Sequence, residues 1–184
     1  MKNIIIFFCL IVVFAGCKKE VNPLWKFHWG YATADMNDNM WSANGCYAQT
    51  NGKDSIGIVF NARDDEQIRE SFSVSSIPLK LGKQFLPSEI SRNGGVLKGT
   101  YMRFMVDGDD DLTCAQYGNL HDADSLQNWV DITEYNPQTK EIKGKFSCNL
   151  LRDPEGGNAG ERCKPSDPEV IRIRNGVFHT KIAR

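Results

Sequence analysis

The stretch Glu141-Ile142-Lys143-Gly144-Lys145-Phe146-Ser147-Cys148-Asn149-Leu150 alternates between two kinds of side chain. One phase holds the apolar and small residues, and the other holds lysines, serine and asparagine. Successive side chains of a strand point to opposite faces, so a period of two indicates a strand with one face on a hydrophobic core. We therefore predict a strand over residues 141–150 with Cys148 on its inner face.

Shorter runs of the same period flank this stretch and are separated by turn dipeptides. The dipeptides are Asn51-Gly52, between 46–50 and 55–62; Asn136-Pro137, between 129–135 and 141–150; and Asn175-Gly176, between 170–174 and 177–182. Asn-Gly adopts the positive φ angles that tight hairpins need. Repeated hairpins predict an all-β protein, an antiparallel β-sandwich or barrel-like domain of roughly 8–10 short strands.

The first 17 residues, MKNIIIFFCLIVVFAGC, combine a basic start, an apolar run and small residues before a cysteine. This pattern is typical of a bacterial secretory signal, and its end resembles a lipobox, where signal peptidase II cuts before a lipid-modified cysteine. The run is shorter than the roughly 20 residues that span a bilayer. We expect a signal peptide over 1–16, lipidation of Cys17, a tether over 17–23 and one domain over 24–184.

Basic and acidic residues are nearly balanced in this chain. The chain has 22 basic and 23 acidic residues, a net charge of −1. Such a balance offers no clustered basic face for nucleic acid. The lipid anchor makes a membrane the first partner, and Lys18-Lys19-Glu20 lacks the aspartate that retains lipoproteins in the inner membrane. We expect an outer-membrane lipoprotein of the cell envelope on the periplasmic face.

Four cysteines remain after the signal and the lipidated residue. They are Cys46, Cys114, Cys148 and Cys163. An even number in an oxidising compartment favours two disulfides, with three possible connectivities. We expect Cys148–Cys163 to close a local loop and Cys46–Cys114 to join distant strands. The alternative, a zinc site, lacks a C-x2-C pair.

An acidic run is the best candidate for a metal site. Asp107, Asp109 and Asp111 could direct oxygens toward one hard cation such as calcium, and we otherwise expect no cofactor. An EF-hand is excluded, because Leu112 stands at the glycine position and Gly118 at the glutamate position. We favour a simpler interpretation, a solvated hairpin tip.

A stripe of aromatic residues alternates along the first expected strand of the domain: Trp25, Phe27, Trp29 and Tyr31. One hypothesis is a sugar-stacking platform, with Trp25 and Trp29 as ligand-binding residues. The other, which we favour, packs these rings into the core.

Three segments carry a resemblance to a known family. They are Trp41-Ser42-Ala43, Ile142-Lys143-Gly144-Lys145-Phe146-Ser147 and Ile173-Arg174-Asn175-Gly176-Val177-Phe178. Their order resembles a family of uncharacterised lipoproteins, common in the Bacteroidetes, that carry a single β-rich domain behind a lipobox. The resemblance implies the fold and an envelope location, and it supplies no catalytic residues.

Three functions remain open. The first is a lipid-anchored, non-catalytic binding or accessory component with an envelope protein or a glycan as partner. The second is a lipocalin-like barrel that carries a small ligand or a glycan. The third is a cryptic hydrolase built around His121 or residues 107–111, although the chain lacks the common nucleophile, zinc, P-loop and dinucleotide motifs. We expect no enzyme.

Overall fold

The computed structural model describes residues 29–51, 54–64, 67–86, 99–107, 110–119, 127–153 and 167–183, without the side chains of 64, 99–113 and 119. The expected signal peptide, Cys17, the tether, Trp25, His121 and Cys163 lie outside these residues. Within the described part, no helix is long and apolar enough to cross a membrane.

Strands make up almost all of the described chain. They are β1 (Gly30–Met36), β2 (Asn39–Ala43), β3 (Gly45–Thr50), β4 (Ser55–Asp64), β5 (Gln67–Pro78), β6 (Gly82–Phe85), β7 (Gly99–Asp107), β8 (Asp110–Asn119), β9 (Trp129–Asn136), β10 (Glu141–Arg152) and β11 (Val170–Ala183). Every pairing is antiparallel except a short parallel contact between β3 and β11. The predicted all-β class is confirmed, with a slightly larger number of strands than expected.

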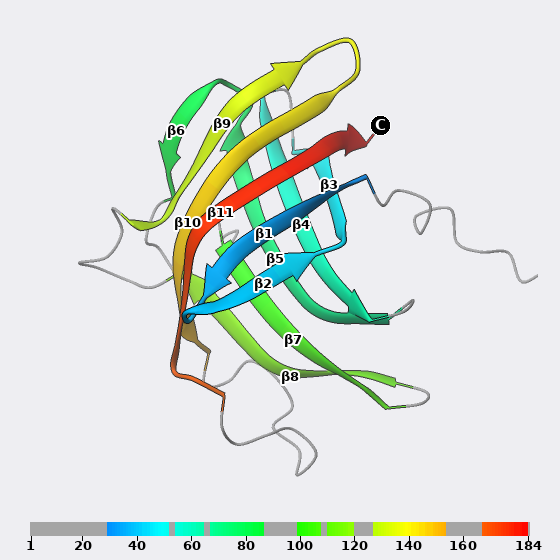
Figure 1. Cartoon of the computed structure of the whole chain (residues 1–184), viewed down its shortest axis with the longest axis vertical. Helices are drawn as coiled ribbons and strands as arrows, with labels where there is room; N and C mark the ends of the chain where they lie inside the picture. The colour runs from blue at the N-terminus through cyan, green and yellow to red at the C-terminus, as the bar shows by residue number, and fades with distance from the viewer. Residues whose placement is uncertain are drawn as a thin grey trace, which may run out of the picture.

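The strands form one sheet in the order β2-β1-β11-β3-β4-β5-β7-β8-β10-β9-β6. An additional pairing joins β10 to β11, so the sheet curls over and brings distant parts of this order together. Figure 1 shows β9, β10, β11, β1 and β2 in front of β3, β4, β5, β7 and β8. The domain therefore has two layers with a shared interior.

Four phenylalanine rings occupy this interior. Phe60 of β4 lies 5.5 Å from Phe72, 5.0 Å from Phe146 and 5.7 Å from Phe178, measured between ring centroids. All four side chains are buried. Rings at these distances gain packing energy beyond the hydrophobic effect alone, so the cluster joins β4 and β5 to β10 and β11.

The alternation predicted for β10 is confirmed, and it explains two glycines. Gly144 is the register partner of Phe178, and Gly176 is the register partner of Phe146. A Cβ atom on Gly144 would lie 2.6 Å from Phe178 Cζ, and one on Gly176 would lie 2.7 Å from Phe146 Cδ1. Each ring thus lies over a glycine of the facing strand.

The predicted pairing of the strands on either side of Asn51-Gly52 and of Asn136-Pro137 is confirmed, because β3 pairs with β4 and β9 pairs with β10 as antiparallel neighbours. The turn predicted at Asn175-Gly176 is wrong, since β11 runs through it without a break. Three steps along β11, from Ile173 to Gly176, match two steps along β10, from Cys148 to Phe146, which defines a β-bulge. Asn175 supplies the positive φ of 53° that the bulge requires.

Replacing Gly144 with alanine tests the packing of the two layers. The new Cβ would lie 2.4 Å from the backbone oxygen of Asp131 and 2.6 Å from Phe178 Cζ. Overpacking of this kind lowers the free energy of unfolding by about 1–3 kcal/mol, which urea denaturation would measure. Gly57→Ala is the matched control, because the nearest atom to its Cβ would be in the flexible amide of Asn51, at 3.0 Å, and the nearest backbone atom, the carbonyl oxygen of Val74, would lie at an ordinary contact distance of 3.7 Å. Equal stability of the two variants would contradict the packing argument.

Candidate functional site

Trp29, directly before β1, and Tyr31 of β1 point to solvent. These two residues are 50% and 54% exposed, whereas Ala32 and Ala34 of β1 are buried. The favoured prediction, that these rings pack into the core, is therefore wrong for Trp29 and Tyr31. The physical reason is the phase of β1, which puts its alanines against an interior already filled by phenylalanine.

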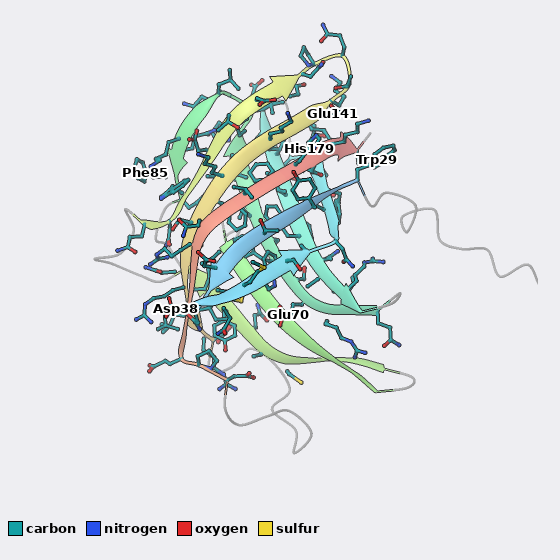
Figure 2. All side chains as sticks on the ribbon, in the orientation of Figure 1. Trp29, Asp38, Glu70, Phe85, Glu141 and His179 are labelled. Carbon is teal, nitrogen blue, oxygen red and sulfur yellow. The ribbon has the colours of Figure 1, made fainter. Side chains whose placement is uncertain are left out.

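The exposed rings belong to a surface that we call the aromatic face, made of Trp29, Tyr31, Glu141, His179 and Lys181. Lys181 Nζ lies 4.3 Å above the centre of the Trp29 ring, within the range of a cation–π contact. The same ammonium lies 3.3 Å from a carboxylate oxygen of Glu141. Tyr31 meets the His179 ring edge to face, at 6.2 Å between centroids. Figure 2 shows Trp29, His179 and Glu141 close together at one end of the molecule.

Cross-strand register extends this face over β10 and β9. Tyr31 is the partner of His179, His179 of Lys143, and Lys143 of Glu134. Lys143 Nζ lies 2.8 Å from Glu134 Oε2, and this hydrogen bond, with the charge of Glu134, raises the pKa of Lys143. The ammonium and carboxylate groups here are paired, so the surface offers donors and acceptors beside the rings without a large excess of either sign.

A buried polar cluster covers the outer side of β10 farther along the strand. Ser147 and Asn149 were placed on the polar face from sequence, yet both are buried. Arg174 lies over them and donates to Asn149 Oδ1, at 2.6 Å, and to the carbonyl of Ile173, at 2.9 Å. Asn128 Oδ1 accepts a hydrogen bond from the Asn149 backbone at 2.6 Å. The alternation of β10 alone does not predict that Ser147 and Asn149 are buried, because the residues that cover them, Arg174 and Asn128, come from other segments of the chain.

The acidic run lies where β7 turns into β8. Asp107 pairs with Asp110 where β7 and β8 run antiparallel, so the expected hairpin pairing is confirmed. The side chains of Asp107, Asp109 and Asp111 lie outside the described part, and calcium binding stays a hypothesis. Among the residues that the structure describes, no three His, Cys, Asp or Glu side chains are grouped to hold a metal ion.

Two of the four cysteines correct the predicted disulfides. Cys46 and Cys148 are buried thiols, so the pairs Cys46–Cys114 and Cys148–Cys163 are both wrong. Each of these thiols faces a core residue, because the register partner of Cys46 is Phe60 and that of Cys148 is Ile173. Cys114 is disulfide-bonded, which removes its thiol from titration.

Burial makes both thiols poor acids. Desolvation raises the pKa of Cys46 and that of Cys148 to about 12, from the ordinary value of 9.0. Since the thiolate is the reactive form of cysteine, neither residue has the character of a nucleophile. Their role is to fill the core.

Comparisons of the chain with protein-family models, curated proteins and solved structures gave no match.

The two thiols predict a loss of stability at alkaline pH. Below pH 9.0 both the folded and the unfolded chain keep these protons. Above that pH only the unfolded chain releases them, so each thiol lowers the free energy of unfolding, at a slope that approaches about 1.4 kcal/mol per pH unit. The loss continues until the folded thiols ionise near pH 12.

Urea denaturation between pH 8.5 and 10.5 measures this slope. The matched control is the double variant Cys46→Ala/Cys148→Ala, whose starting stability is lower but whose slope lacks the contribution of both thiols. Parallel pH profiles for the two proteins would contradict the assignment of buried, protonated thiols.

Proposed function

We propose that this protein is a lipid-anchored, non-catalytic component of the cell envelope that binds neutral glycans on the aromatic face. The observation that carries the proposal is the half-exposure of Trp29 and Tyr31 on one outer surface. Flat rings of this kind pack against the apolar faces of sugar rings, and paired lysine and glutamate groups beside them hydrogen-bond to hydroxyls. Contiguous exposed apolar surface that is rimmed by polar groups is a recognised mark of an interaction site.

The size of the apolar patch favours a glycan over a protein partner. A half-exposed aromatic side chain contributes roughly 100 Å² of surface. Together with Val177, which is 38% exposed, the two rings therefore offer a small patch. A standard protein interface takes about 800 Å² from each partner. One or two sugar rings fit the available surface better.

The rings are also held in place before any ligand arrives. Trp29 lies under Lys181, and Tyr31 rests against His179 on the neighbouring strand. Side chains that are ordered in the free protein lose less entropy on binding, which favours affinity. The two rings therefore form a pre-organised surface for a ligand.

A ligand inside the domain, as in a lipocalin, receives less support. The cluster of Phe60, Phe72, Phe146 and Phe178 fills the interior at its own level, and two of its rings lie on glycines. A ligand at that level would have to displace packed rings. The outer face needs no such rearrangement.

The envelope location rests on the N-terminal sequence. The lipobox-like ending predicts an acylated Cys17, and several acyl chains on one cysteine bind membrane far more firmly than a single chain. We propose that the domain is tethered to the outer membrane, on its periplasmic face. This position would bring the aromatic face near the polysaccharides of the envelope.

Removing the rings tests glycan binding. Trp29→Ala and Tyr31→Ala should each weaken binding of a neutral N-acetylhexosamine tetrasaccharide by about 5–30-fold, equivalent to 1–2 kcal/mol per ring. Isothermal titration calorimetry measures the affinity, and circular dichroism checks the fold. Phe85→Ala is the matched control, because Phe85 is 56% exposed on β6, away from this face. Equal binding by all three variants, or none by the parent protein, would exclude the proposal.

Replacing Cys17 tests the anchor separately. Cys17→Ala should block lipidation and keep the signal attached, because signal peptidase II cuts before a modified cysteine. Metabolic labelling with a palmitate analogue should mark the parent protein and leave the variant unmarked. Cys46→Ala, which alters a buried thiol of the domain, is the control and should still be labelled. Labelling of the Cys17 variant would contradict the anchor.

A further inference from the structure

A pocket of about 330 Å³ lies where the turn between β1 and β2 meets the start of β11. Its lining carries both charges and consists of Asp35, Asn37, Asp38, Pro168, Val170, Arg172 and Arg174. Figure 2 shows Asp38 far from Trp29 and His179, toward the opposite end of the molecule. A ligand of this pocket is therefore independent of glycan binding at the aromatic face.

The wall of the pocket is held by the side chain of Asn37. Its Oδ1 accepts from the backbone N–H of Arg172 at 2.8 Å, and its Nδ2 donates to the carbonyl of Val170 at 3.3 Å. The backbone N–H of Asn37 donates to the Arg172 carbonyl at 2.9 Å. These three bonds fix the turn against β11, so the backbones of Asp38 and Arg172 keep a constant separation.

Two oppositely charged side chains of this pocket, those of Asp38 and Arg172, do not pair with each other. Asp38 and Arg172 line the same pocket, yet within the described part of the chain neither side chain forms an ion pair or hydrogen bond. Asp35 uses only Oδ2, which accepts from Asn175 Nδ2 at 2.7 Å. Opposite charges that stay apart in one pocket can each be paired by a ligand that carries both signs.

We propose that this pocket binds a small zwitterion of the amino acid or short peptide class. The ligand carboxylate accepts hydrogen bonds from the Arg172 guanidinium, and the ligand ammonium lies between Asp35 and Asp38. The volume equals that of about eleven water molecules at about 30 Å³ each, which suits a ligand of dipeptide size. A simple anion would meet the carboxylates of Asp35 and Asp38, and a simple cation would meet the guanidinium group of Arg172.

Binding can be tested with glycylglycine as the probe. The full mature chain in detergent micelles is titrated, and NMR records the amide shifts. We expect saturable shifts at Asn37, Asp38 and Val170, and affinities at least about tenfold weaker for acetate and methylamine, which carry one charge each. The absence of shifts around this pocket would overturn the proposal, as would acetate binding as tightly as the dipeptide.

Charge-removing variants then assign the two contacts. Asp38→Asn and Arg172→Gln should each weaken the dipeptide about tenfold. Both should fold, since asparagine tolerates the positive φ of 64° at position 38 and the Arg172 side chain bonds to no described residue. The matched controls are Asp54→Asn and Lys80→Gln, at exposed positions outside this pocket, which should bind like the parent. Unchanged binding in either pocket variant would overturn the proposal.

Discussion

The domain depends on two reciprocal contacts between β10 and β11. Phe146 lies over Gly176, and Phe178 lies over Gly144, so each strand supplies one ring and one glycine to its neighbour. This exchange lets rings from adjacent strands occupy one level of the interior without colliding. Both then reach Phe60 on the other layer. A side chain larger than hydrogen at either glycine would separate the strands that join the two layers.

The bulge at Asn175 decides which residues of β11 face outward. In a regular strand, residues that are an even number of positions apart point to the same face. Without the extra residue of the bulge, His179 would therefore be buried together with Ile173. With it, Phe178 and Thr180 are buried, and His179 takes part in the aromatic face. Arg172 and Arg174 remain on the outer side before the bulge. One residue with a positive φ therefore places both proposed binding surfaces on the same strand.

Local patterns predicted the fold well where neighbouring segments pair, as in the hairpins at 51–52 and 136–137. These patterns were wrong where the same dipeptide occurs in two different backbone structures. Asn-Gly provides the positive φ of a hairpin turn and of a bulge alike, and only the partners of β11 show which is formed. The disulfides were wrong for a related reason: cysteine spacing does not reveal that Cys46 and Cys148 each face a core residue.

The exposed rings of the candidate site could have been predicted by a different weighting of the same alternation. A period of two defines two faces of a strand, and it does not state which one is buried. Trp29 and Tyr31 share their phase with Asp35, whereas Ala32 and Ala34 form the other phase. Burying a carboxylate without a partner has a large free-energy penalty, whereas burying alanine has almost none. The penalty for burying Asp35 should therefore exceed the gain from burying the aromatic rings. This comparison places Trp29 and Tyr31 on the solvent side, where they can bind a ligand.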